Sequence, residues 1–204
     1  MSEKSFQIEK YSFEGQRTWD SVVSRSKNGN FLHLRNYLDY HADRFEDHSV
    51  MVHRNGKPIA VFPANRAGDE VVSHGGITYG GLIYGSGLHA SDVLGIMETL
   101  AGYYRSIGVR QLVYKAIPHI YHRYPAEEDL YALFRLGAVR CRCDISSVIT
   151  LENKLKLSDS RKCTIRKSAS MGVEIREGDF FASYHALLCQ VLARLGSPPV
   201  HSLQ

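Results

Sequence analysis

Two pairs of glycines within one short apolar stretch constrain this chain more than any other feature. The stretch reads SHGGITYGGLI, residues 73–83, and it places His74 and Tyr79 beside the glycine pairs. Glycine is a poor strand residue, so each pair indicates a positive φ, a bulge, or the close approach of a ligand or another backbone. A turn needs only one such pair, whereas two pairs flanking polar groups favour the floor of a pocket. We therefore expect a concave, solvent-reachable recess lined by an imidazole and a phenol.

The length and composition are those of a globular protein with one large domain, or with one domain and part of a second. Of the 204 residues, 44% are apolar and 23% are charged, which argues against disorder. No apolar run approaches the ~18 residues of a membrane span, and the first residues lack the apolar core of a signal peptide. We therefore expect a cytoplasmic protein with no transmembrane segment. The net charge of +4 suits an anionic small molecule better than DNA.

The cysteines predict neither a metal site nor a disulfide framework. Cys141 and Cys143 are two positions apart, while Cys163 and Cys189 are isolated. No C-x-x-C pair is available for zinc, so we expect reduced thiols. The histidine-containing segment at residues 119–124 does not have the spacing of a metal signature and lies between prolines, which favours a loop with packed aromatic rings. The sequence therefore predicts no metal.

Hydrophobic periodicity predicts a mixed α/β (α+β) unit over residues 1–151. Asn55-Gly56 is a strong hairpin signal between two apolar runs. Helical spacing and capping residues predict the helices. The strands are expected at residues 6–12, 49–53, 58–64, 70–73, 78–83, 111–116 and 139–151, and the helices at 18–26, 34–45, 91–107 and 127–136.

The character of the chain changes after residue 151. Residues 152–160 are polar and charged, as in a linker, and a helix (161–171), a strand (173–176) and a second helix (179–195) are expected after them. One strand and two helices cannot build a core alone. We therefore expect residues 152–204 to be a linker and the incomplete start of a second domain.

Four segments together resemble one family. They are residues 73–82, residues 114–121 (YKAIPHIY), residues 124–133 (YPAEEDLYAL) and the basic helix with the residues after it, 161–173. In this set the chain resembles the GNAT-fold acyltransferases of the FemA/FemB-like type. That group includes the peptidoglycan bridge-forming aminoacyltransferases and shorter N-acetyltransferases of bacterial surface-polysaccharide clusters. The resemblance runs from about residue 29 to the end.

The resemblance implies a GNAT-like mixed, largely antiparallel sheet flanked by helices, followed by the start of a second GNAT-like half. Members of the family have two such halves, the first of which helps to hold the acceptor. The implied activity is acyl transfer, N-acetyl or aminoacyl, to an amine of an amino sugar or cell-envelope precursor. The implied donor is acyl-CoA (acetyl-CoA) or aminoacyl-tRNA, and the implied acceptor is a nucleotide-sugar or a peptidoglycan precursor. Relatives continue beyond the point where this chain stops, so C-terminal truncation and an inactive chain are expected possibilities.

Acyl transfer to an amine needs a base, a polarised carbonyl and an acid for the leaving group. His74 is a candidate base because its ordinary pKa lies near neutrality, and Tyr79 is a candidate proton donor. With them, Gly75, Gly80 and Lys115 are candidates for substrate binding. The alternatives are that His74 bonds a neighbouring carbonyl and that Lys115 faces solvent.

The basic helix offers a second candidate surface. Arg161, Lys162, Arg166 and Lys167 place four cations within seven residues. Arg161 and Arg166 are candidates for binding a phosphate-rich substrate such as a nucleotide-sugar. The alternative is an ordinary solvated helix.

Three functions remain open on the sequence. The first is an acyltransferase, the second a non-catalytic acceptor-binding or interaction module derived from one, and the third a nucleic-acid binder that uses the basic helix. Binding of acyl-CoA separates the first two, and salt-insensitive, weak binding to nucleic acid excludes the third.

Overall fold

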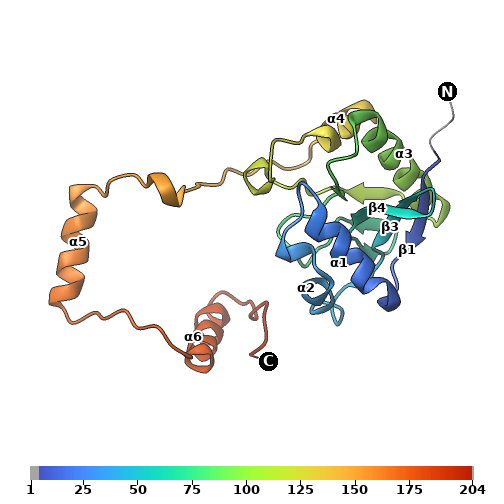
Figure 1. Ribbon diagram of the computed structural model, residues 1–204. Helices are drawn as coiled ribbons and strands as arrows, with labels where there is room; N and C mark the ends of the chain where they lie inside the picture. Colours follow the sequence, from blue (N-terminus) through green and yellow to red (C-terminus); the bar gives the residue numbers. More distant parts are fainter. Residues whose placement is uncertain (1–4, 204) are drawn as a thin grey trace. The chain divides into compact units, whose positions relative to one another are not determined.

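The computed structural model describes residues 5–203 and divides the chain into two units, one ending at Cys143 and one beginning at Asp144 (Figure 1). The first unit carries all of the described strands and the buried core. The division of the sequence at residue 151, and the assignment of residues 152–204 to an incomplete second domain, stay predictions.

The first unit has helices before and after a run of six consecutive short strands, β2 to β7. Its elements are β1 (Gln7–Lys10), η1 (Phe13–Gly15), α1 (Gln16–Arg25), η2 (Phe31–His33), α2 (Arg35–Asp39), β2 (Glu46–Asp47), β3 (Val50–Arg54), β4 (Lys57–Phe62), β5 (Asn65–Ala67), β6 (Glu70–Val72), β7 (Ile83–Tyr84), α3 (Ala90–Ser106), β8 (Gln111–Val113), η3 (His119–Tyr121) and α4 (Glu128–Arg135). The strands form two sheets, ordered β1-β3-β4-β7 and β2-β5-β6-β8. All pairings are antiparallel except that of β6 with β8. The predicted α/β class with a mixed, largely antiparallel sheet flanked by helices is confirmed.

One antiparallel register runs through both sheets, although they have no strand in common. Asp47 pairs with Asn65 in β2 and β5, and Val50 pairs with Phe62 in β3 and β4, so one antiparallel register continues across the break. Pro63 lies at the break, where it has no N–H to donate to the ladder.

The two sheets separate on the other side of β4 and β5, away from β2 and β3. β7 pairs with β4, and β6 pairs with β5, so the loop of residues 73–82 must cross between the two sheets. Most of the glycine-rich stretch is therefore a loop and not the predicted strand 78–83, of which only Ile83 is in β7. Because β8 pairs with β6, the end of β8 lies beside the same loop.

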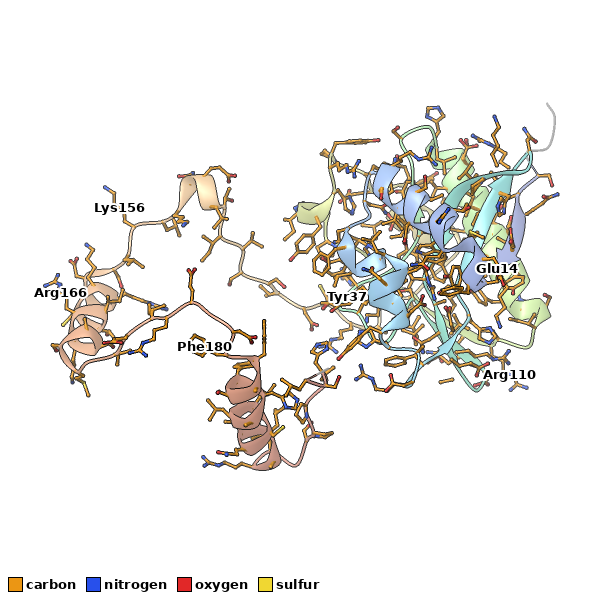
Figure 2. The ribbon with its side chains drawn as sticks, turned by 60° about the horizontal axis from the view of Figure 1, so that its bottom comes forward. Glu14, Tyr37, Arg110, Lys156, Arg166 and Phe180 are labelled. Atoms are coloured by element: carbon orange, nitrogen blue, oxygen red, sulfur yellow. The ribbon has the colours of Figure 1, made fainter. Side chains whose placement is uncertain are left out.

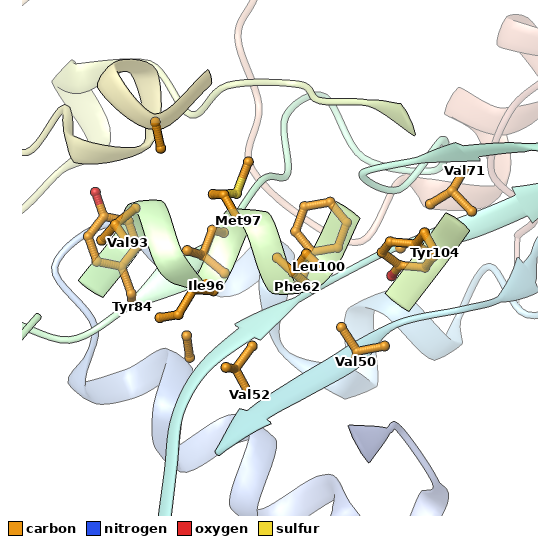
Figure 3. Packing of buried hydrophobic residues seen from close by; sticks show 14 of the residues in the cluster. Val50, Val52, Phe62, Val71, Tyr84, Val93, Ile96, Met97, Leu100 and Tyr104 are labelled. Carbon is orange, nitrogen blue, oxygen red and sulfur yellow. The ribbon is translucent and has the colours of Figure 1, made fainter. Parts of the chain in front are cut away.

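Helices cover both faces of the sheet at β3 and β4. Val50 and Val52 pack with α3, whereas Met51 between them packs with α1 and α2, as the two-residue period of a strand requires. Figure 3 shows the α3 side, where side chains four or three apart on the helix meet those of the strands. The α3 residues are Val93, Ile96, Met97, Leu100 and Tyr104.

The second unit holds η4 (Leu151–Asn153), α5 (Asp159–Ser170) and α6 (Phe181–Ala193). Among its described residues, 144–203, no side chain is buried. The strands predicted at 139–151 and 173–176 are wrong, because an alternating sequence forms a strand only where a partner strand accepts its hydrogen bonds. Val139 and Ile145 are 88% and 99% exposed. Within residues 5–203, no helix is long and apolar enough to cross a membrane.

Candidate functional site

The second glycine pair allows a very close approach of backbone to backbone. A Cβ on Gly80 would lie 2.0 Å from the carbonyl oxygen of Ser73. Gly81 has a φ of +86°, and a Cβ there would lie 2.7 Å from the ring of Tyr114. Of the causes expected from the sequence, positive φ and close backbone approach therefore account for this pair.

The first glycine pair lies against two aromatic side chains. A Cβ on Gly75 would lie 2.9 Å from the ring of Phe45, and one on Gly76 would lie 2.8 Å from the ring of His41. Both amides have acceptors, because the N–H of Gly75 donates to Asn65 Oδ1 (2.5 Å) and that of Gly76 donates to His74 Nδ1 (3.2 Å). These amides are therefore engaged within the protein and do not form an open anion cradle.

His74 is buried at the start of this loop. It has a φ of 64° and an exposed fraction of 4%, and its ring centroid lies 5.6 Å from that of Phe45. Burial lowers the pKa of His74 to about 4, so the imidazole is neutral at pH 7. The expectation that this ring lines a solvent-reachable recess is wrong, because the ring is buried beside those of His41 and Phe45.

Tyr79 is also buried, with an exposed fraction of 8%. Its hydroxyl accepts a hydrogen bond from Asn30 Nδ2 (3.0 Å), and its ring stacks on that of Tyr121 with centroids 5.0 Å apart. Burial raises the pKa of Tyr79, so its phenol keeps its proton at neutral pH. Gly75 and Thr78 are the exposed residues of the loop, and Gly76 is partly exposed.

Lys115 holds the loop in place. Its ammonium group donates to the carbonyl oxygens of His74 (3.1 Å) and Ile77. Its backbone N–H donates to Ser73 Oγ (2.7 Å), and its carbonyl accepts from the N–H of Gly80 (3.0 Å). Partial burial lowers the pKa of Lys115. The alternative of a solvent-facing lysine is therefore wrong.

The structure brings most of the sequence-predicted site residues together. His74, Gly75, Tyr79 and Gly80 lie in one loop, and Lys115 bonds to that loop directly. Arg161 and Arg166 lie on α5 of the second unit with exposed side chains. The parts that all of these residues play in substrate binding or catalysis stay predictions. Within residues 5–203, no three His, Cys, Asp or Glu side chains are placed to hold a metal ion.

The sequence did not predict the hydrogen bonds that connect the end of the loop to Tyr114 and Asp129. The hydroxyl of Tyr114 accepts from the N–H of Leu82 (2.9 Å) and donates to Asp129 Oδ2 (2.6 Å). Asp129 is 3% exposed, and burial raises its pKa. No spacing in the sequence signals this link, because the three residues come from different elements.

It also missed a buried arginine next to the loop. Arg35 is 2% exposed, forms ion pairs with Asp39 and Asp47, and lies 3.6 Å from the ring centroid of Tyr11. A buried guanidinium with two carboxylates is costly to leave unpaired, so the pairs fix α2 against β2. A lone arginine in an amphipathic segment carries no signal for such a role.

The phenol of Tyr114 gives a first prediction. We expect Tyr114→Phe to lower the free energy of unfolding by about 2–4 kcal/mol, because it leaves the Leu82 N–H and the Asp129 carboxyl without their partner. The measurement is urea denaturation followed by circular dichroism. Tyr103→Phe is the control, since Tyr103 is partly exposed and belongs to the same fold. Equal midpoints for the two variants would contradict the anchoring role.

Comparison with known proteins gives limited similarity. No protein-family model matches the chain, and no curated protein matches it. Among solved structures, the chain is similar to the aminoglycoside N-acetyltransferase AAC(6')-Iy in complex with CoA. The identity is 11% and the TM-score is 0.46, over 72% of this chain and 95% of that one. No family membership follows from these comparisons.

Proposed function

We propose that this protein is a GNAT-like acyltransferase that acts in the cytoplasm on an amine of an amino sugar or cell-envelope precursor. The proposed donor is acyl-CoA or aminoacyl-tRNA, and residues 152–204 are assigned to the start of a second half of the same kind. One observation carries the proposal. Two of the segments on which the family resemblance rests, 73–82 and 114–121, are in direct contact, through Lys115 and the loop and through the stacked rings of Tyr79 and Tyr121.

At neutral pH His74 is unprotonated, as a general base must be, and Tyr79 carries its proton, as a general acid must. Burial also makes His74 a weaker base and Tyr79 a weaker acid, so proton transfer by these rings requires that they become more accessible to solvent. The side chains of His74 and Tyr79 are buried, so we place the substrate at the residues of the loop that are exposed to solvent, Gly75 and Thr78. Direct proton transfer by either ring then requires the loop to move outward.

A second function is favoured by the burial of these groups. His74 and Tyr79 are nearly inaccessible, and the amides of Gly75 and Gly76 are already bonded. A loop of this kind suits a non-catalytic module that binds an acceptor on its outer surface.

A titration with acetyl-CoA separates the two functions. We expect saturable binding by calorimetry, weakened about tenfold in Lys115→Met because that change frees the loop. Lys57→Met is the control, since Lys57 is exposed at the start of β4. If neither acetyl-CoA nor an aminoacyl-tRNA binds while an amino sugar does, the non-catalytic module is the correct function.

A further inference from the structure

Three aromatic side chains that reach solvent lie near Tyr79, which is a buried residue of the loop. Phe31 and Tyr121 are 64% and 48% exposed, and Tyr37 is partly exposed. We call these three residues the aromatic rim. Tyr37 is labelled in Figure 2, on α2 in the first unit.

Ring contacts and one hydrogen bond join the rim residues to one another through the loop. Tyr121 stacks on Tyr79 with an interplanar angle of 22°, and Phe31 packs edge-on against Tyr37 with centroids 5.6 Å apart. Asn30, which precedes Phe31, donates to the hydroxyl of Tyr79. The two parts of the rim are therefore linked through Tyr79, with Tyr121 on its ring face and Asn30, next to Phe31, at its hydroxyl.

The rim is rigid enough to bind without rearranging. The Asn30 side chain accepts from the N–H of Leu32 (3.0 Å), and the N–H of Asn30 donates to His33 Nδ1 (3.0 Å), so both ends of η2 are fixed. The N–H of Tyr121 donates to the carbonyl of Pro118 (3.0 Å), which closes the turn of η3. Exposed rings that are fixed in this way lose little entropy on binding.

Size and polarity identify the class of ligand. With ~200 Å² for each side chain, the exposed parts of the three residues amount to about 240–300 Å², which is below the ~800 Å² that each partner contributes to a stable protein interface. The rings are uncharged, and Thr78, which precedes Tyr79 in the chain, is exposed and carries a hydroxyl. Flat apolar faces bordered by neutral hydrogen-bonding groups match a hexose ring, which has apolar C–H faces and a hydroxyl edge.

We infer that the aromatic rim of Phe31, Tyr37 and Tyr121 binds the pyranose ring of an amino sugar across the exposed side of the loop. This inference rests on the proposed function, because it places the acceptor of that reaction. It adds the residues that hold the acceptor and the type of contact that holds it.

The test is a titration of the isotope-labelled full chain with glucosamine, followed by the amide resonances of Asn30, Thr78 and Tyr121. We expect saturable shifts at these three positions, and about tenfold weaker binding in Phe31→Ala and in Tyr121→Ala. Phe31 is mostly exposed, so its truncation leaves the core intact. Phe134→Ala is the matched control, because Phe134 is a 76% exposed aromatic residue on α4.

The outcomes separate this inference from the proposed function. Sugar binding at the rim without any acyl transfer would overturn the proposed function and leave the binding site standing. Acyl transfer without shifts at the rim would overturn the inference. The inference would also be overturned if UMP, a nucleotide without an amino-sugar acceptor, shifted the same amide resonances while glucosamine did not. A third contradicting result would be that Phe134→Ala weakens glucosamine binding as much as Phe31→Ala does.

Discussion

Gly80→Ala is expected to unfold the first unit or to lower its stability by about 4 kcal/mol or more. The new Cβ would lie 2.0 Å from the carbonyl oxygen of Ser73 and 2.9 Å from the carbonyl carbon. Both atoms belong to backbone, so no side chain can turn away to make room. Relief requires Gly80 to move away from Ser73, which disturbs the bond from the Gly80 N–H to the carbonyl of Lys115.

Gly85→Ala is the matched control for this change. Gly85 lies just after β7, and a Cβ there has nothing within 4 Å and no positive φ to oppose it. Thermal unfolding followed by circular dichroism compares the two variants with the natural chain. A Gly80→Ala melting temperature as high as that of Gly85→Ala would show that the loop is not packed as described.

Acidification is expected to destabilise the first unit by about 4 kcal/mol between pH 7.5 and pH 5 through two buried histidines. Burial lowers the pKa of His33 to about 4 and that of His74 to about 4, whereas an unfolded histidine has a pKa near 6.5. Between these values the unfolded chain binds more protons than the folded chain. The stabilising contribution is therefore complete above pH 6.5 and is lost as the pH falls toward 4. The raised pKa of Asp129 acts in the opposite direction at lower pH.

His74→Asn isolates one of these two contributions. Asparagine tolerates the positive φ of this position, and its side-chain oxygen can replace Nδ1 as the acceptor for Gly76. We expect the pH dependence of the free energy of unfolding between pH 5 and pH 7 to fall by about half. His119→Asn, which replaces an exposed histidine in η3, is the control variant. An unchanged slope in His74→Asn would mean that His74 does not titrate as described.

Local signals in the sequence predicted the elements that depend on local chemistry. Asn55 and Gly56 both have positive φ, at 52° and 72°, and they join β3 to β4 as the hairpin signal indicated. The helix predicted at 91–107 corresponds to α3, and Gly108 after it has a φ of 83°. These features were predictable because each depends on residues within a few positions of one another.

Elements that depend on distant partners were not predictable in the same way. The helix expected over residues 34–45 is α2, which ends at Asp39, where Arg35 joins Asp39 to Asp47 of β2. The alternating residues after Gly137 form no strand, because no described strand pairs with them. Periodicity reports which face of a segment is apolar, and it does not report whether a partner is present.

In the candidate site, too, the sequence predicted the local feature and did not predict its distant partners. The glycine pairs correctly indicated crowding around residues 75–81, but a glycine does not reveal what occupies the space beside it. Here the rings of His41, Phe45 and Tyr114 and the backbone of Ser73 occupy it. The anchors Lys115 and Tyr114 come from the end of β8, and only the sheet order brings them to the loop.

A transfer assay tests the central claim most directly. The full chain is incubated with acetyl-CoA and glucosamine, and mass spectrometry follows both the acetylated sugar and free CoA. We predict that the two products form in equal amounts and that Lys115→Met slows their formation more than Lys57→Met does. Saturating binding of both substrates with no acetylated sugar and no CoA release above the protein-free control would contradict the assignment.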